Sequence, residues 1–244
     1  MFVKKLSINI LTLYEMFYKG LRRGILIFYA NTFKLLTSKH MRLQKGDSNM
    51  QFQLQFITDE LPQTPVHINQ RTAVRGVIHY QNKILMVQTN RGDYKFPGGG
   101  MEEGETEKET LLREITEETG YTDIHIGVKI GETFEQNIDT EDPESYFQMK
   151  SCYYECWLMS DKRAPGVQDD YEEKLGFHGT FVTVEEAYQS NLSLLKREQK
   201  KMHDFLQKAY IAQMDQKIKE QVTFAPEIPW LERETQVLYK LNRT

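Results

Sequence analysis

A cluster of glutamates that follows a glycine-rich turn constrains this chain more than any other feature of its sequence. Glu114, Glu117 and Glu118 stand at positions i, i+3 and i+4, so a helix would place them within about 100° of one face. Like charges at this spacing repel one another, and the helix gains nothing from them unless a cation binds there. Because carboxylates are the ligands that hard divalent ions prefer, the pattern predicts a metal-binding helix face.

The segment before this helix, Pro97-Gly98-Gly99-Gly100, predicts a turn whose backbone can approach phosphate groups closely. The alternative is a solvated acidic helix, in which Arg113 forms ordinary surface pairs with Glu109 and Glu117 that contribute about 0.2–0.5 kcal/mol each. That alternative explains neither the glycine-rich turn nor the excess of acids on one face, so we favour the metal site.

The same segment resembles the Nudix box, G-x5-E-x7-R-E-U-x-E-E-x-G-U, in which U is a bulky aliphatic residue. The matching positions are Gly99, Glu105, Arg113, Glu114, Ile115, Glu117, Glu118 and Gly120. Tyr121 stands at the last U position, a departure that affects packing rather than chemistry. A pattern of this length is far more specific than a lone GxGxxG motif.

The resemblance implies a Nudix-type hydrolase, a metal-dependent pyrophosphohydrolase that acts on acid anhydrides in phosphorus-containing compounds. The implied cofactor is Mg²⁺ or Mn²⁺, which binds phosphate oxygens and lowers the pKa of a bound water. The implied metal ligands are Glu114, Glu117, Glu118, Glu102 and a carbonyl of the glycine turn, at Gly99. Arg113 is implied to pair with acids, Glu105 among them, and to hold the catalytic glutamates in position.

The general base is left open between two places in the sequence. Members of the family use either a glutamate of the box, here Glu114, or one from a later loop. That loop carries Asp169, Asp170, Glu172 and Glu173. We favour Glu172 or Glu173, because they lie just before a predicted strand, although the acids of this loop could also be simply solvated.

Substrate contacts are expected outside the box. Arg75 and Arg71 could reach phosphates, and Phe96 could stack on a base. Because strands alternate and one face must be buried, most aromatic residues of the neighbouring strands are expected in the core.

Signatures of the family's branches exclude several substrates. An ADP-ribose-type enzyme would carry Pro at position 136, and a dinucleoside-polyphosphate type would carry Tyr at 136–138; this chain has Gln136, Asn137 and Ile138. A coenzyme A signature before Phe96 is absent as well. A nucleoside triphosphate, an oxidised nucleotide or another nucleoside-diphosphate derivative remains, and we favour a nucleoside diphosphate linked to another group.

Local patterns predict the secondary structure around the box. β-rich runs at 72–80 and 83–89 flank a hairpin turn at Gln81-Asn82. A capping box at Thr106 predicts a helix that ends at Gly120. Its expected buried stripe comprises Leu111, Leu112 and Ile115. Further elements are expected as strands at 124–135, 146–159 and 177–182, an acidic loop at 167–176, a short helix after Thr183, and helices at 194–222 and 230–241.

This order of elements is what the Nudix fold presents: an α/β class, α/β/α sandwich with a mixed β-sheet, plus C-terminal helices. The resemblance covers residues 70–192 as a Nudix hydrolase domain. Residues 193–244 form an expected C-terminal helical extension that packs on the domain or mediates dimerisation.

Residues 1–49 form a basic N-terminal extension with nine Lys or Arg and two acids, a net charge of +7, whereas the rest of the chain carries −11. The apolar runs of this extension are too short to span a bilayer, although a basic helix on a membrane surface is an alternative. We favour Met50 as the true start and 1–49 as translated upstream sequence. Peptides from before Met50 in native protein would contradict this hypothesis.

The acidic body argues against binding to nucleic acid, including an RNA 5′ end. A small nucleotide is therefore the expected partner, with a possible homodimer. The two cysteines, Cys152 and Cys156, suit a cytoplasmic protein with buried thiols. A Nudix-fold module that binds a nucleotide without turnover is the main alternative function, and the complete acid set argues against it.

Overall fold

The computed structural model describes residues 50–57, 67–139, 142, 144–164, 170–214 and 227–243. The expectations for residues 1–49, and the position of Asp169, lie outside this part of the chain. No helix within these ranges is both long enough and apolar enough to cross a membrane.

A mixed seven-stranded sheet forms the centre of the molecule, with the strand order β1-β5-β6-β2-β3-β4 and β7 paired to β3. The strands are β1 (Phe52–Ile57), β2 (Ile68–Tyr80), β3 (Lys83–Gln88), β4 (Tyr94–Lys95), β5 (Ile124–Ile138), β6 (Tyr146–Leu158) and β7 (His178–Val182). The β1–β5 and β2–β6 pairs are parallel, and β2 and β3 form the expected antiparallel hairpin. Its turn residue Gln81 has φ 54°, a conformation typical of tight hairpin turns.

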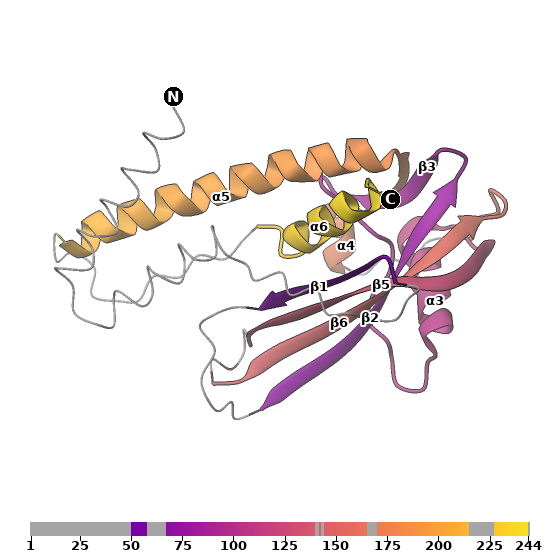
Figure 1. Cartoon of the computed structure of the whole chain (residues 1–244), viewed down its shortest axis with the longest axis horizontal. Helices are drawn as coiled ribbons and strands as arrows, with labels where there is room; N and C mark the ends of the chain where they lie inside the picture. Colours follow the sequence, from indigo (N-terminus) through magenta and orange to yellow (C-terminus); the bar gives the residue numbers. More distant parts are fainter. Residues whose placement is uncertain are drawn as a thin grey trace.

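Helices cover both faces of the sheet, which confirms the α/β/α sandwich (Figure 1). On one face, α3 (Glu107–Thr119) buries Leu111 and Ile115 against Val74 and Ile78 of β2. On the other face lie the long α5 (Val184–Met214) and the shorter α6 (Leu231–Leu241). There Ala187, Val237 and Leu238 join Phe96 and Tyr153 in a second cluster.

Local capping defines the ends of α3. Thr106 accepts a hydrogen bond from the Glu109 backbone N–H, and the Glu109 side chain accepts one from the Thr106 N–H, an arrangement that contributes about 1 kcal/mol. The helix ends at Gly120, whose φ is 77°. The prediction of a buried Leu112 was wrong: this residue is 37% exposed, because it lies about 100° around the helix from Leu111.

The C-terminal half differs from the sequence prediction in two places. A single helix, α5, runs from residue 184 to 214 where two helices were expected, and it crosses the expected domain boundary at 192. No Gly or Pro interrupts this stretch, so nothing local ends the helix. The predicted acidic loop contains a short helix, α4 (Asp170–Leu175).

Both cysteines are free and buried, as predicted. Burial raises the pKa of Cys152 to about 11 and that of Cys156 to about 12. These thiols therefore stay protonated at neutral pH and pack as small apolar groups.

Candidate active site

Helix α3 turns its acidic face toward the glycine-rich turn. A side-chain carbon at Gly99 would overlap the carboxylate of Glu114, so this glycine leaves room for the acid. One turn of helix further on, Glu118 Oε2 accepts a hydrogen bond from the Gly98 N–H at 2.8 Å. Two of the predicted metal ligands are therefore in direct contact with the turn.

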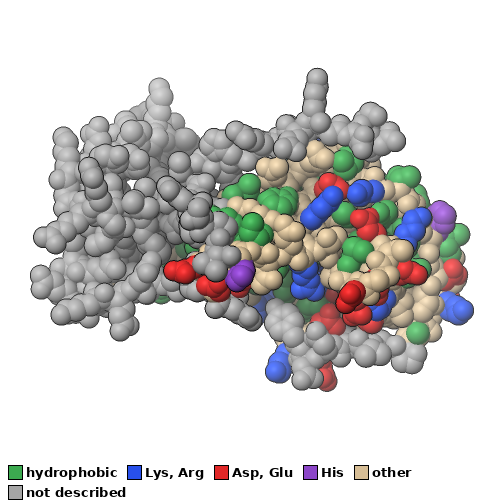
Figure 2. Space-filling view, turned by 90° about the horizontal axis from the view of Figure 1, so that it is seen from below, with side chains coloured by type: hydrophobic (Ala, Val, Ile, Leu, Met, Phe, Trp, Pro, Cys, Tyr) green, Lys and Arg blue, Asp and Glu red, His purple; other side chains and the backbone are tan. Residues whose placement is uncertain are grey.

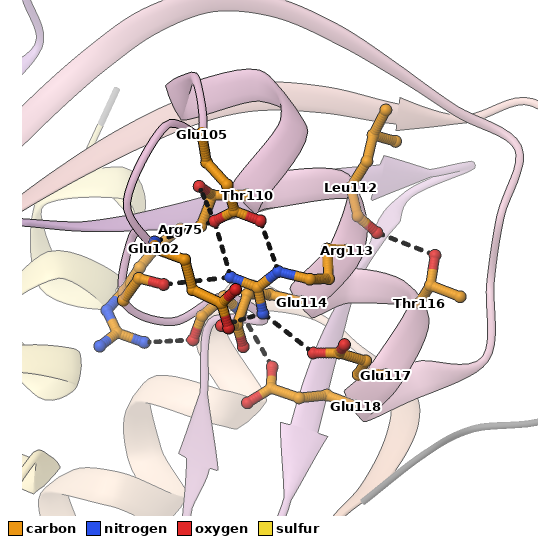
Figure 3. A network of polar contacts seen from close by, with 12 residues as sticks. Arg75, Glu102, Glu105, Thr110, Leu112, Arg113, Glu114, Thr116, Glu117 and Glu118 are labelled. Atoms are coloured by element: carbon orange, nitrogen blue, oxygen red, sulfur yellow. Dashed lines mark hydrogen bonds and ion pairs between the residues drawn. The ribbon is translucent and has the colours of Figure 1, made fainter.

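Arg113 holds the acids of this site together (Figure 3). Its guanidinium donates to both oxygens of Glu105 at 2.7 and 2.9 Å, and from Nη1 to Glu114 at 2.8 Å and Glu117 at 3.1 Å. Nη2 also donates to the Gly100 carbonyl at 3.2 Å. The Arg113 hydrogen bond lowers the pKa of Glu105 to about 2. This planar, multidentate side chain therefore ties the acids to the turn. That these acids are the catalytic ones stays a prediction.

Strand β2 fixes the backbone of the turn. The Val74 N–H donates to the Gly99 carbonyl at 2.9 Å, and the Gly76 N–H donates to the Pro97 carbonyl at 2.8 Å. An isolated bridge also links Ala73 to Gly100. The turn is thus part of the sheet framework, which suits a site that must hold reacting groups in a defined geometry.

Lys95 is a site residue that the sequence did not reveal. Its ammonium lies 2.5 Å from Glu118 Oε1, and it also sits 4.5 Å from the centroid of the Phe177 ring. Glu118 is only 3% exposed, so this cation compensates a carboxylate that has little access to water.

The three acids on this side of α3 outnumber the two cations, Arg113 and Lys95, that contact them, which leaves a net negative charge. Burial is the main cause that raises the pKa of Glu114, and the charges of Glu118 and Glu117 act in the same direction, against the Arg113 hydrogen bond. A hard divalent cation would relieve this repulsion, and the oxygen donors present suit Mg²⁺ or Mn²⁺. The residues therefore fit the predicted metal.

The carboxylates are not arranged as a complete metal cage in the part of the chain that the structure covers. No three His, Cys, Asp or Glu side chains converge there as a metal-binding group. Protein cations engage these carboxylates: Arg113 binds Glu114 and Glu117, and Lys95 binds Glu118. The assignment of the ligands stays a prediction that the donor chemistry supports.

Two predicted substrate residues lie behind the turn. Phe96 has no exposed surface and packs edge-on against Tyr153 at 5.7 Å, so it cannot stack on a base in this structure. Arg75 is 6% exposed, and its Nη1 donates to the Gly98 carbonyl at 2.9 Å. It supports the turn from within the protein, which replaces its expected role in phosphate binding.

Arg71 is better placed to meet a phosphate. It is exposed, and its guanidinium lies so close to Gly100 that a side-chain carbon at Gly100 would overlap it.

Glu102, a predicted metal ligand, is exposed in the loop after the turn, where its backbone N–H donates to Glu105 Oε2 at 3.0 Å. Seen from below, acidic and basic side chains lie intermixed over the described surface (Figure 2).

The acids proposed as a loop base, Glu172 and Glu173, lie on α4. The last residue of this helix, Leu175, packs with Phe177, whose ring lies beneath Lys95. The described contacts thus connect α4 to Glu118 through Phe177 and Lys95. Whether Glu172 or Glu173 acts as the base stays a prediction.

A second charged residue that the sequence analysis missed is Glu234 of α6. It is fully buried, and its Oε2 accepts a hydrogen bond from the Phe96 N–H at 3.2 Å. One signal was present in the sequence: Leu231, Glu234 and Leu238 stand at i, i+3 and i+7, which places a charge on the apolar stripe of the helix.

Gly99→Ala tests the fit between the turn and Glu114. The added methyl group would meet the end of a flexible side chain, so we expect the protein to fold with nearly unchanged thermal stability. The displaced carboxylate should lower kcat by about 10–100-fold. Melting curves and a metal titration of activity check both parts. An unchanged kcat at every metal concentration would contradict a role in activity for the contact between Gly99 and Glu114.

Comparison with known proteins identifies the family of the domain. The family model described as NUDIX domain matches residues 69–208. A curated relative from Methanocaldococcus jannaschii, named ADP-ribose pyrophosphatase, is 38% identical over 65 residues, which are 25% of this chain and 38% of the relative. The aligned segment therefore spans well under half of that relative's length.

Many solved structures are similar, two of them at the low sequence identities that follow. One, an ADP-ribose pyrophosphatase from Streptococcus suis, has a TM-score of 0.34 and 20% identity, covering 47% of this chain and 75% of the other. The second, described as a UDP-X diphosphatase, has a TM-score of 0.35 and 19% identity, covering 48% of this chain and 52% of the other. The NUDIX domain model matches more than half of the residues of this chain, which therefore belongs to the Nudix family.

Proposed function

We propose that this protein is a divalent-metal-dependent pyrophosphohydrolase that cleaves the phosphoanhydride of a nucleoside diphosphate linked to another group. The observation that carries this proposal is the acidic face of α3, where Glu114 and Glu118 lie against the glycine-rich turn and Arg113 ties Glu114 and Glu117 to it. The M. jannaschii relative is named for a substrate of this class. Gln136, where an ADP-ribose branch would carry Pro, leaves the group beyond the diphosphate open.

In this proposal, some residues of the site bind the metal or the substrate and others position those that bind. Glu114, Glu117 and Glu118, with a carbonyl of the Gly98–Gly100 turn, would hold Mg²⁺ or Mn²⁺. When bound, the cation supplies charge neutralisation at the phosphates and a more acidic water. Arg113 keeps the carboxylates in register with the turn. Arg71, exposed beside Gly100, would meet the negative charge of the diphosphate.

Glu114 is the better-supported candidate for the general base. It touches the turn against which the diphosphate is proposed to lie, and a general base must lie within hydrogen-bond reach of the proton that it accepts. Glu172 or Glu173 is the second candidate, on a helix that reaches the site through Phe177 and Lys95.

The test is hydrolysis across a panel of nucleotides with Mg²⁺ and with Mn²⁺, followed by coupled phosphate release. The panel should include ADP-ribose, nucleoside-diphosphate sugars, dinucleoside polyphosphates and nucleoside triphosphates. We expect turnover of the diphosphate-linked class, abolished by EDTA and restored by added metal. Metal binding without turnover of any compound would instead favour a Nudix-fold module that binds a nucleotide.

A further inference from the structure

Helix α6 carries two buried charges on the face that packs against the domain. Arg233 is 4% exposed and Glu234 is 0% exposed, although they lie among Leu231, Val237 and Leu238. Burying an ion pair costs desolvation free energy that apolar side chains of similar size would avoid. Packing of α6 alone therefore does not explain why these two residues are charged.

The two charges belong to a network that leads outward to the sheet. Arg233 donates from Nε and Nη2 to Glu234 Oε1 at 3.1 and 2.8 Å. Its Nη1 donates to Glu135 of β5 at 2.6 Å. Although burial opposes it, the charges of Glu234 and Glu135 keep the pKa of Arg233 above its ordinary value. Arg233 therefore orients Glu234 from one side.

The carboxylate of Glu234 also faces the residues that flank the glycine-rich turn. Oε2 accepts the Phe96 N–H at 3.2 Å, immediately before Pro97. Oε1 lies 3.9 Å from Arg75 Nε, and Arg75 donates from Nη1 to the Gly98 carbonyl at 2.9 Å. Glu234 thus supports the turn on both sides of Pro97, directly through Phe96 and indirectly through Arg75.

The same turn leads on to the acidic face of α3. The Gly98 N–H donates to Glu118 Oε2 at 2.8 Å, and the Gly98 carbonyl accepts from Arg75, so Gly98 connects Arg75 on one side with Glu118 on the other. Helix α6 lies outside residues 69–208, which the family model matches. This support is therefore supplied by the C-terminal extension of this chain.

We propose that Glu234 is a positioning residue: from the C-terminal helix it holds the Phe96–Gly98 backbone, through Phe96 and Arg75, in the geometry that the active site needs. The proposal rests on the proposed function for its catalytic consequence. Glu234 lies behind the turn with no exposed surface, so it acts through the turn and does not touch the substrate.

Glu234→Gln removes the charge while keeping the size of the side chain. We expect kcat to fall by about 10–100-fold with KM within about threefold, as for other residues that orient ligands from behind. Amide hydrogen exchange of residues 96–100, where Pro97 has no amide hydrogen, should become faster. Arg75→Gln, which cuts the second link but leaves the Arg233–Glu234 pair, should give the same pattern, and it carries the test if Glu234→Gln does not fold.

Val237→Ala is the matched control. Val237 is a fully buried residue of the same helix in the core cluster with Phe96, so its truncation loosens the packing of α6 without touching the charged network. It should lower the melting temperature and leave both kcat and exchange at 96–100 near wild type. The proposal is overturned if Glu234→Gln speeds exchange in α6 alone, or loses no more kcat than Val237→Ala does.

The exchange measurement separates this proposal from the proposed function. If the wild-type protein hydrolyses no compound of the panel, the function fails, while exchange at residues 96–100 still shows whether Glu234 holds the turn. If hydrolysis is found and exchange at the turn is unaffected in both Glu234→Gln and Arg75→Gln, the function stands and the positioning role fails.

Discussion

Glu118→Gln and Glu114→Gln should each lower kcat by about 10²–10⁴-fold, the range expected when a positioned carboxylate that assists proton transfer or cation binding is removed. Gln keeps the shape of Glu but loses the charge that attracts a divalent ion. Both side chains touch the glycine-rich turn, so their loss acts where the phosphates are proposed to bind. Initial rates over a matrix of substrate and Mg²⁺ concentrations would separate lost metal affinity from lost turnover.

Glu114→Gln and Glu118→Gln should differ in thermal stability, because the two carboxylates have different surroundings. The pKa of Glu114 is raised in the folded state, so its ionisation works against folding as pH rises through the folded-state pKa. Glutamine stays neutral, and Glu114→Gln should therefore melt at the same temperature as wild type or higher at pH 7.

Glu118→Gln should instead melt at a lower temperature. The substitution leaves Lys95, whose side chain is 11% exposed, without its carboxylate partner. We expect a loss of about 1–3 kcal/mol in the free energy of unfolding. The loss stays in this range because the Phe177 ring still contacts the ammonium. Glu103→Gln, which removes an exposed acid from the loop before α3, is the control and should change neither property. Near-wild-type turnover in both active-site variants would refute the proposed roles.

Features coded by neighbouring residues were predictable from the sequence. The ends of α3 follow from the Thr106 capping box and the left-handed Gly120, and the β2–β3 hairpin follows from its turn residues. The spacing of Glu114, Glu117 and Glu118 is fixed by helix geometry alone. These signals act within a few residues, so they survive without any knowledge of the tertiary structure.

Features that depend on distant contacts were not predictable. Lys95 meets Glu118 across 23 residues, and Glu234 meets Phe96 across 138. Neither pairing leaves a local pattern, because packing of the sheet against α3 and α6 creates it. The same packing buries Phe96. From the sequence alone, an aromatic residue at this position could equally belong to a surface that stacks on a base.

Gly98→Ala should destabilise the protein by about 2–5 kcal/mol, lower its melting temperature by about 5–15 °C and abolish most activity. Gly98 has φ 136°, which disfavours any side chain. In addition, the new methyl group would overlap the Val74 carbonyl oxygen and lie 2.8 Å from the Arg75 Cα. Both are backbone atoms of β2, so neither can move aside as a flexible side chain would.

Gly104→Ala separates the two causes of this effect. Gly104 also has a positive φ, 85°, but no atom lies within 4 Å of an added side-chain carbon, so its substitution should cost only backbone strain, about 1 kcal/mol. The excess loss in Gly98→Ala then measures how tightly the turn is pressed against β2. That close approach also places the Gly98 N–H on Glu118 and its carbonyl on Arg75, so the excess loss of stability and the loss of kcat should occur together. Equal stability of the two variants would show that the turn can shift away from β2, and the rigid geometry argued for the site would then be wrong.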